Sequence, residues 1–218
     1  SHLVSLVGEV DQNLFTIGRI QNRVLPEKID RLGRVIDKLE GAKFAPVIDQ
    51  TFVEDLANST TDAKLWFTRN SYDALLNFGG FKYLEDVELE AYLSASFSSA
   101  ETLLQQPLHS RAEYASTING LIPSRVMVEF HPMRGYVMGN VMAPKYDDNV
   151  DYARLAASIF ENRARLVSLA RNEMAYATGT WYALERMRGD FIFLRSAILE
   201  HPLMKGVEVE QIFDLPEM

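Results

Sequence analysis

The opening run of the chain, from Leu3 to Leu39, constrains the fold most, because its apolar residues recur at helical spacing. Steps of four and three residues alternate along it, which places the apolar side chains on one face of an α-helix. The face is formed by Leu3, Val7, Val10, Leu14, Ile17 and Val24, and then by Leu25, Ile29, Leu32, Ile36 and Leu39. The pattern predicts one long helix over residues 3–40 that buries this face against other helices.

The second part of this pattern is displaced by one residue from the first, and Pro26 lies beside the displacement. Proline has no backbone N–H and clashes with the preceding turn, so we expect a kink near Val24–Pro26. A coiled-coil dimer would also use such a helix. The broad apolar stripe and the displacement favour packing inside an intramolecular bundle instead.

A second long helical tract is predicted over residues 151–200. Its apolar stripe is interrupted by the polar residues Asn162 and Glu173 and is displaced by one residue after Gly179. The two long tracts are natural packing partners for each other. The tail, residues 201–218, is acidic and is expected to be extended or strand-like.

Between the two tracts, residues 46–119 predict several short helices separated by polar, glycine and proline breaks. The expected helices are Pro46–Ala57, Asp62–Arg69, a segment from Asn70 that Gly79 and Gly80 stop, a segment from Glu85–Asp86 to Leu104, and Ser110–Leu121. The second of these helices is expected to bury Leu65, Trp66 and Phe67.

Residues 120–149 form an irregular connection that is interrupted by glycine and proline. Apolar residues alternate with other residues at Val126, Val128 and Phe130, which fits a small β-hairpin. A short helix capped by Ser124 fits the same residues equally well.

The chain is therefore predicted to be all-α, a multi-helix bundle built on two long kinked helices, with residues 3–218 in a single domain. Ser1 and His2 are interpreted as the remnant of an expression tag. Because the apolar pattern is already in progress at Leu3, we expect a membrane-anchoring segment upstream of it. The alternative is that the natural protein begins nearby.

Charge and composition exclude several classes of partner. The 30 acidic residues outnumber the 22 lysines and arginines, and the net charge of -8 opposes binding to nucleic acid or to an anionic membrane surface. The chain has no cysteine, which excludes disulfides and thiolate chemistry. This composition fits a cytoplasmic and an extracytoplasmic bacterial setting equally well.

The sequence lacks the motifs of the common catalytic and metal sites. The four histidines stand at no metal-ligand spacing, and no Glu-x-x-His motif of a di-iron bundle is present. A Gly-x-Ser-x-Gly elbow, a phosphate-binding glycine loop and a dinucleotide fingerprint are also missing. We therefore expect no metal, no cofactor and no enzymatic activity.

Five residues in two places are candidates for contact with a ligand or a partner. They are His131, Arg134, Tyr136, Trp181 and Tyr182. The first three lie in the loop FHPMRGYVM, which combines charged and apolar residues in a long connection. The other two can line an aromatic pocket together with Trp66. An ordinary surface loop and a packed aromatic core are the respective alternatives.

The segment NSYDALLNFGGFKYLEDVELEAYLSASF, residues 70–97, combines an aromatic residue, a leucine pair, a glycine stop, an acidic turn and a helical run. In this pattern, and in the long helix before it, the chain resembles a family of small bacterial membrane proteins of unknown function. The resemblance implies a single N-terminal transmembrane helix followed by a helical extracytoplasmic domain. It places the domain at the inner membrane, facing the periplasm, with a cytoplasmic location as the alternative.

These observations together predict a non-enzymatic domain that binds a partner protein, or associates with itself, and transmits a signal through its first helix. The connection to the membrane would run through the missing N-terminal helix. A bundle that senses a small molecule held between the long helices is the alternative function.

Overall fold

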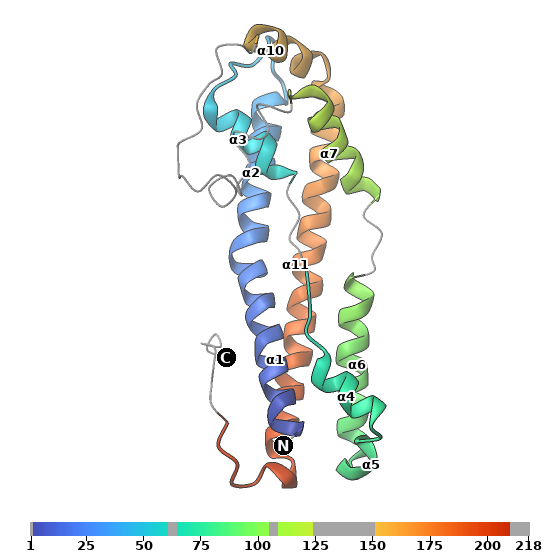
Figure 1. Cartoon of the computed structure of the whole chain (residues 1–218). Helices are drawn as coiled ribbons and strands as arrows, with labels where there is room; N and C mark the ends of the chain where they lie inside the picture. The colour runs from blue at the N-terminus through green and yellow to red at the C-terminus, as the bar shows by residue number, and fades with distance from the viewer. Residues whose placement is uncertain (1, 61–64, 105–108, 124–150, 210–218) are drawn as a thin grey trace. The chain divides into compact units, whose positions relative to one another are not determined.

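A computed structural model describes residues 2–60, 65–104, 109–123 and 151–209, and every regular element in these ranges is a helix (Figure 1). The elements are α1 (His2–Arg19), the π-helical turn η1 (Ile20–Val24), α2 (Leu25–Leu39), α3 (Gln50–Ser59), α4 (Asn70–Asn77), α5 (Phe81–Leu84), α6 (Val87–Leu104), α7 (His109–Leu121), α10 (Tyr152–Glu161), α11 (Arg163–Glu200) and the 3-10 turn η2 (Pro202–Met204). The all-α prediction is confirmed for these residues. The predicted hairpin lies outside them.

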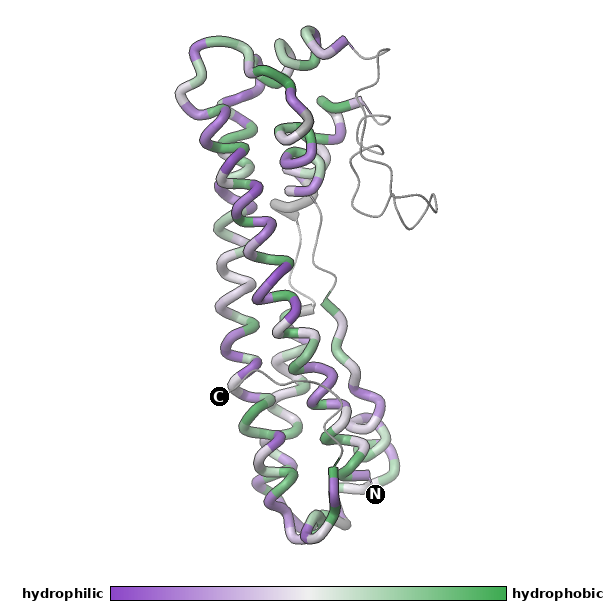
Figure 2. Tube along the Cα trace, turned by 90° about the vertical axis from the view of Figure 1, so that its left-hand side faces the viewer, coloured by the Kyte–Doolittle hydropathy of each residue, from purple (hydrophilic) through white to green (hydrophobic). Residues whose placement is uncertain are grey.

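The chain divides into two compact units, each assembled from separated segments. Unit 1 comprises residues 1–24, 63–106 and 180–218, and unit 2 comprises residues 25–62 and 107–179. The prediction of a single domain stays a prediction. Figure 2 shows hydrophobic and hydrophilic residues alternating along the long helices, as the amphipathic pattern requires.

Unit 1 is organised around α1, which is buried on a wide face. Apolar residues are buried on α1 and on the C-terminal half of α11, and the two sets are Leu6, Val7, Val10, Leu14 and Ile17 on α1 and Leu184, Phe191, Leu194 and Ile198 on α11. Arg195 of α11 also donates to the buried Asp11 of α1, with 2.5 Å between Nε and Oδ1. The predicted pairing of the two long tracts is therefore found within this unit.

Stacked aromatic rings join the shorter helices of unit 1 to α11. The ring of Tyr72 in α4 stacks on Phe97 in α6 with 4.5 Å between centroids, and Phe97 meets Phe191 of α11 edge to face at 5.6 Å. Phe81 of α5 contacts the edge of Tyr72 at 6.2 Å. Such pairs add about 0.5–1.5 kcal/mol beyond the burial of their area, so this aromatic cluster fixes the corner where α4, α5 and α6 meet.

Unit 2 has a separate core in which α2, α3, α7, α10 and the N-terminal half of α11 meet. The buried residues include Leu32, Val35, Leu39, Phe52, Val53, Leu56, Tyr114, Ile118, Ile159, Leu166 and Ala170. Helix α3 begins where Asp49 accepts a hydrogen bond from the backbone N–H of Phe52 at 2.8 Å. Phe52 is buried, whereas Val47, which precedes the cap, is 76% exposed.

The one-residue displacement in the first helix coincides with the π-helical turn η1, and the predicted kink at Pro26 is not confirmed. A π-helical turn inserts one extra residue into an α-helix. The insertion returns the second apolar series to the same face, which is why Leu25 and Leu32 remain buried. The displacement in the second tract needs no such turn. Apolar residues spaced alternately by four and three residues repeat every 3.5 residues on average, whereas an α-helix has 3.6 residues per turn. The apolar stripe therefore drifts around the helix by about one residue in ten turns.

The predicted helix Asp62–Arg69 is wrong for the residues that the structure describes there, because residues 65–69 are not helical. Asn13 of α1 holds this segment: it accepts from the backbone N–H of Thr68 at 2.8 Å and donates to the carbonyl of Thr68 at 2.9 Å. The prediction that Trp66 is buried is also wrong, since it is 51% exposed. Its ring lies 5.5 Å from the guanidinium carbon of Arg19.

The second long tract is divided at Asn162, which caps the end of α10 before α11 begins. The side-chain amide of Asn162 donates to the carbonyl of Ser158 at 2.9 Å. The same Ser158 carbonyl also accepts from the backbone N–H of Asn162 at 3.2 Å, so the side-chain amide adds a second bond to it. The polar residue that interrupts the apolar stripe is therefore a local break in the helix.

Candidate functional site

The predicted contact residues fall partly outside the described part of the chain. His131, Arg134 and Tyr136 lie in residues 124–150 and stay predictions. Trp181 and Tyr182 are described and lie on α11 in unit 1. Their rings meet edge to face at 5.3 Å, and Tyr182 is 66% exposed, so Tyr182 does not belong to the core.

Trp181 exchanges hydrogen bonds with Gln21 in the π-helical turn of unit 1. The indole N–H donates to the backbone carbonyl of Gln21 at 3.1 Å, and the Gln21 amide donates to the carbonyl of Trp181 at 3.2 Å. The same amide also donates to the Glu185 carboxylate at 3.0 Å. The indole N–H, the polar group that a ligand would address, is thus used to fasten α11 to the first helix. Ligand contact by Trp181 and Tyr182 stays a prediction.

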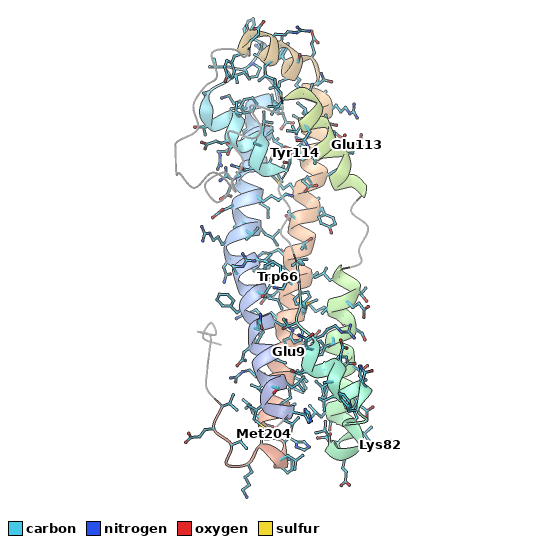
Figure 3. All side chains as sticks on the ribbon, viewed as in Figure 1. Glu9, Trp66, Lys82, Glu113, Tyr114 and Met204 are labelled. Carbon is cyan, nitrogen blue, oxygen red and sulfur yellow. The ribbon has the colours of Figure 1, made fainter. Side chains whose placement is uncertain are left out.

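Glu9 of α1 supplies the N-terminal cap of α4. Its carboxylate oxygens accept hydrogen bonds from the backbone N–H groups of Ser71 and Tyr72, both at 3.1 Å. The residue at the cap position itself, Arg69, provides no capping side chain. Burial raises the pKa of Glu9 above its ordinary value, and the hydrogen bonds from the backbone of α4 lower it by less. Figure 3 labels Glu9 on α1.

The core of unit 2 holds a buried ion pair between Lys28 of α2 and Glu173 of α11. The two side chains are 5% and 3% exposed, and the Lys28 ammonium contacts the Glu173 carboxylate directly. Glu173 stands out in the sequence as a polar residue in an apolar stripe, whereas Lys28 lies beside the stripe of its own helix and gives no such signal. Burying both charges is tolerated because each neutralises the other.

A second polar contact in unit 2 joins Tyr114 of α7 to Ser59 of α3, with 2.8 Å between the hydroxyl oxygens. Figure 3 labels Tyr114 on α7. Burial raises the pKa of the Tyr114 phenol well above its ordinary value, and the charges of Glu173 and Asp55 act in the same direction. Tyr114 is therefore neutral over the physiological range and acts as a structural hydrogen-bonding group.

Unit 1 exposes large apolar side chains on the segment that joins α4 to α6. Leu76 is 47% exposed, Phe78 is 81% exposed and Val87 is 82% exposed. We call these three residues, together with the exposed acidic residues Glu85, Glu88 and Glu90 near Val87 in the sequence, the α4–α6 surface. Sequence reasoning missed this surface, because an apolar residue at a helix end is indistinguishable from a core residue until its direction is known.

A helix-terminating turn sets the position of Phe78. Gly79 has a φ of 64°, and its N–H donates to the Leu76 carbonyl at 3.5 Å, while the N–H of Gly80 donates to the Leu75 carbonyl at 2.9 Å. This is the Schellman arrangement that ends α-helices at a glycine. It leaves Phe78 as the C-terminal cap residue of α4, at a defined place and outside the core.

Phe81 and Leu84 of this segment contact the rest of unit 1. Phe81 contacts Tyr72, and the buried Leu84 offers its carbonyl to the Nε2 of His201 at 3.2 Å. The same imidazole accepts from the backbone N–H of Leu203 at 3.2 Å through Nδ1. The segment is thus anchored to the end of α11, and the α4–α6 surface stands on a well-packed base.

Within the described ranges of the chain, no group of three or more histidine or carboxylate side chains is placed to hold a metal ion. None of the helices described is both long enough and apolar enough to cross a membrane.

Comparison with known proteins gives no family assignment: no protein-family model, no curated protein and no solved structure matches the chain. The resemblance to membrane-anchored bacterial proteins gains no support from these comparisons.

Proposed function

We propose that this chain is a non-enzymatic protein-interaction domain that binds its partner through the α4–α6 surface. The observation that supports the proposal is the exposure of Phe78 and Val87, each more than 80%. Single exposed apolar residues are common on soluble proteins. Here two large ones, with Leu76, occur on one short segment of unit 1, which is the property of a contact site.

The rigidity of the segment supports the same function. Phe78 is held by the turn at Gly79 and Gly80, and the ring of Tyr72 beneath the segment stacks on Phe97. A backbone that is already in place loses little conformational entropy when a partner binds it. An aromatic residue on such a base is typical of the residues that contribute most to binding energy at interfaces.

Site-specific photo-crosslinking in the source cells tests the proposal. A photoreactive phenylalanine analogue at position 78 is expected to form a covalent adduct with a discrete partner protein. Phe44 provides a matched control, because it is also a phenylalanine, is 82% exposed and lies in unit 2. An adduct at position 78 alone supports the proposal. No adduct at 78, or the same set of adducts at 78 and 44, contradicts it.

We further propose that the domain faces the periplasm and is held at the inner membrane by a helix upstream of Leu3, with signal transmission through the first helix. The support is the resemblance described from residues 70–97. The full-length gene is expected to encode an apolar run of about 20 residues upstream, and its product is expected to fractionate with membranes. A full-length product that is recovered in the soluble fraction contradicts the anchor.

A further inference from the structure

We infer that the partner of the α4–α6 surface presents a basic amphipathic helix, whose apolar residues contact Phe78 and Val87 and whose lysines or arginines face the acidic residues beside them. The inference rests on the proposed interaction function and adds the chemistry of the partner.

The charges on this segment favour a basic partner. Residues 76–90 contain Glu85, Asp86, Glu88 and Glu90 but only one basic residue, Lys82. Glu85, Glu88 and Glu90 are exposed. A cation brought to this segment therefore meets several carboxylates, while a second acidic surface would be repelled. Charge complementarity of this kind increases the association rate and excludes wrong partners.

Local structure accounts for some of these acidic residues. Asp86 accepts a hydrogen bond from the backbone N–H of Leu89 at 2.9 Å, so it caps the start of α6. Glu88 and Glu90 lie in the first turn of α6, where the helix dipole favours negative charge. Glu88 also accepts from the phenol of Tyr92 at 3.1 Å. These three residues would be present in a helix with no partner at all.

Glu85 is not accounted for in this way. It has a φ of 49° and a ψ of 26°, the left-handed region, and is the only non-glycine residue with positive φ among the described residues. A residue with a Cβ atom is less stable there than glycine by about 1–2 kcal/mol. The chain thus keeps an exposed carboxylate, two residues before Val87, at a position where glycine would favour the fold. We assign this carboxylate to a charge on the partner.

The secondary structure of unit 1 favours a helical partner. A partner strand binds by extending the edge of a sheet, and the described residues contain no strand. An amphipathic helix needs no backbone pairing, since it binds through apolar side chains spaced one turn apart. The apolar and basic side chains of such a helix match the apolar and acidic side chains that the α4–α6 surface exposes.

Defined peptides test this inference on the whole chain. The probe is a fluorescent peptide of about 18 residues, long enough to form a helix, with leucines on one face and lysines on the other. One control peptide has the same composition in scrambled order. The second control peptide has glutamate in place of each lysine. Binding is followed by fluorescence anisotropy at about 0.05 and about 0.3 M salt, which separates screened from unscreened contacts.

Two protein variants divide the surface into its apolar and acidic parts. Phe78→Ser with Val87→Ser removes the apolar part, and Glu85→Gln with Glu88→Gln and Glu90→Gln removes the acidic part. Each is expected to weaken binding of the leucine–lysine peptide at least tenfold, and the second is expected also to reduce its salt dependence. Phe44→Ser is the matched control, with unchanged affinity expected. Circular dichroism shows which variants keep the native helix content.

The outcomes separate this inference from the proposed function. Preferential binding of the amphipathic lysine peptide that both variants weaken supports the inference. Equal binding of the scrambled lysine peptide shows charge attraction alone and overturns it. Binding that depends on Phe78 and Val87 but not on the three glutamates also overturns it, yet leaves the interaction function standing. A crosslinked partner at position 78, together with no binding of any peptide, overturns the chemistry inferred here and retains the function.

Discussion

Glu9 of α1 accepts a hydrogen bond from the backbone N–H of Tyr72 in α4 at 3.1 Å, across a sequence separation of 63 residues. The orphan N–H groups at the start of a helix are usually satisfied by a neighbouring serine, threonine, aspartate or asparagine. Here a side chain from another helix takes that role. The contact therefore stabilises α4 and also fastens it to α1.

Replacing Glu9 with alanine is expected to destabilise the protein by about 1–3 kcal/mol, the range for removing one partner from buried hydrogen bonds. The two N–H groups of Ser71 and Tyr72 would lose their acceptor. The free energy of unfolding in urea measures the effect. Glu161→Ala, on an exposed position, serves as the control. A loss as small as that of the control would show that water replaces the carboxylate without cost.

Glu9 also gives the stability a defined pH dependence. Because burial raises its pKa above 4.5, the folded state binds this proton more tightly than the unfolded chain does. The contribution of Glu9 is therefore fully present below the unfolded pKa and decreases as the pH rises through the folded pKa. Glu9→Gln cannot ionise, so its stability relative to the wild type is expected to increase between about pH 4 and pH 7. Urea unfolding of both proteins across this range measures the difference, and a decrease contradicts the prediction.

Substituting either Lys28 or Glu173 alone is expected to destabilise the protein strongly, whereas substituting both together is expected to be tolerated. Lys28→Met alone or Glu173→Leu alone leaves an uncompensated charge in the core, which costs about 3–5 kcal/mol. The double variant removes both charges, and such replacements are often neutral or stabilising by about 1–4 kcal/mol. A double-mutant cycle from thermal or urea unfolding checks this. Additive losses in the double variant would show that the two side chains do not interact energetically.

Substitutions at Gly79 and Glu85, which both have left-handed backbone conformations, are expected to change the stability in opposite directions. Gly79→Ala places a Cβ atom where φ is 64° and should destabilise by about 1–2 kcal/mol. Glu85→Gly relieves the same conformational cost where φ is 49°, and should stabilise by up to about 1 kcal/mol. The cost of ordering glycine reduces the second effect. Melting temperatures of both variants test the pair, and destabilisation by Glu85→Gly would contradict the assignment of strain to that residue.

Unfolding is expected to occur in one cooperative transition, as the single-domain prediction requires. The chain passes between the two units within α11, at Gly179 and Thr180, so partial unfolding of one unit would also disrupt a helix of the other. Both tryptophans, Trp66 and Trp181, belong to unit 1, so their fluorescence reports on that unit. Circular dichroism reports on the helices of both. Coincident urea curves are expected from the two signals, and separate midpoints would show that the units unfold independently.

Local sequence signals were sufficient to predict most helix positions. The long first helix, the stop at Gly79 and the start near Asp86 all follow from residues a few positions apart, whereas the helix predicted from Pro46 begins only at Gln50. The non-helical backbone at Thr68 did not, because its hydrogen bonds are made with Asn13 on another helix. The exposure of Phe78 was missed for a related reason: its hydropathy predicts burial, while its direction depends on how the turn at Gly79 meets the rest of unit 1.

The sequence by itself determined that the chain is helical and which helix faces are apolar, because periodicity, capping and glycine conformations act over a few residues. Only the tertiary structure decided which faces meet. The cap of α4 by Glu9, the pairing of Lys28 with Glu173 and the bonds between Gln21 and Trp181 each join residues far apart in the chain. The energies of such contacts depend on burial and distance, which exist only after the helices have packed.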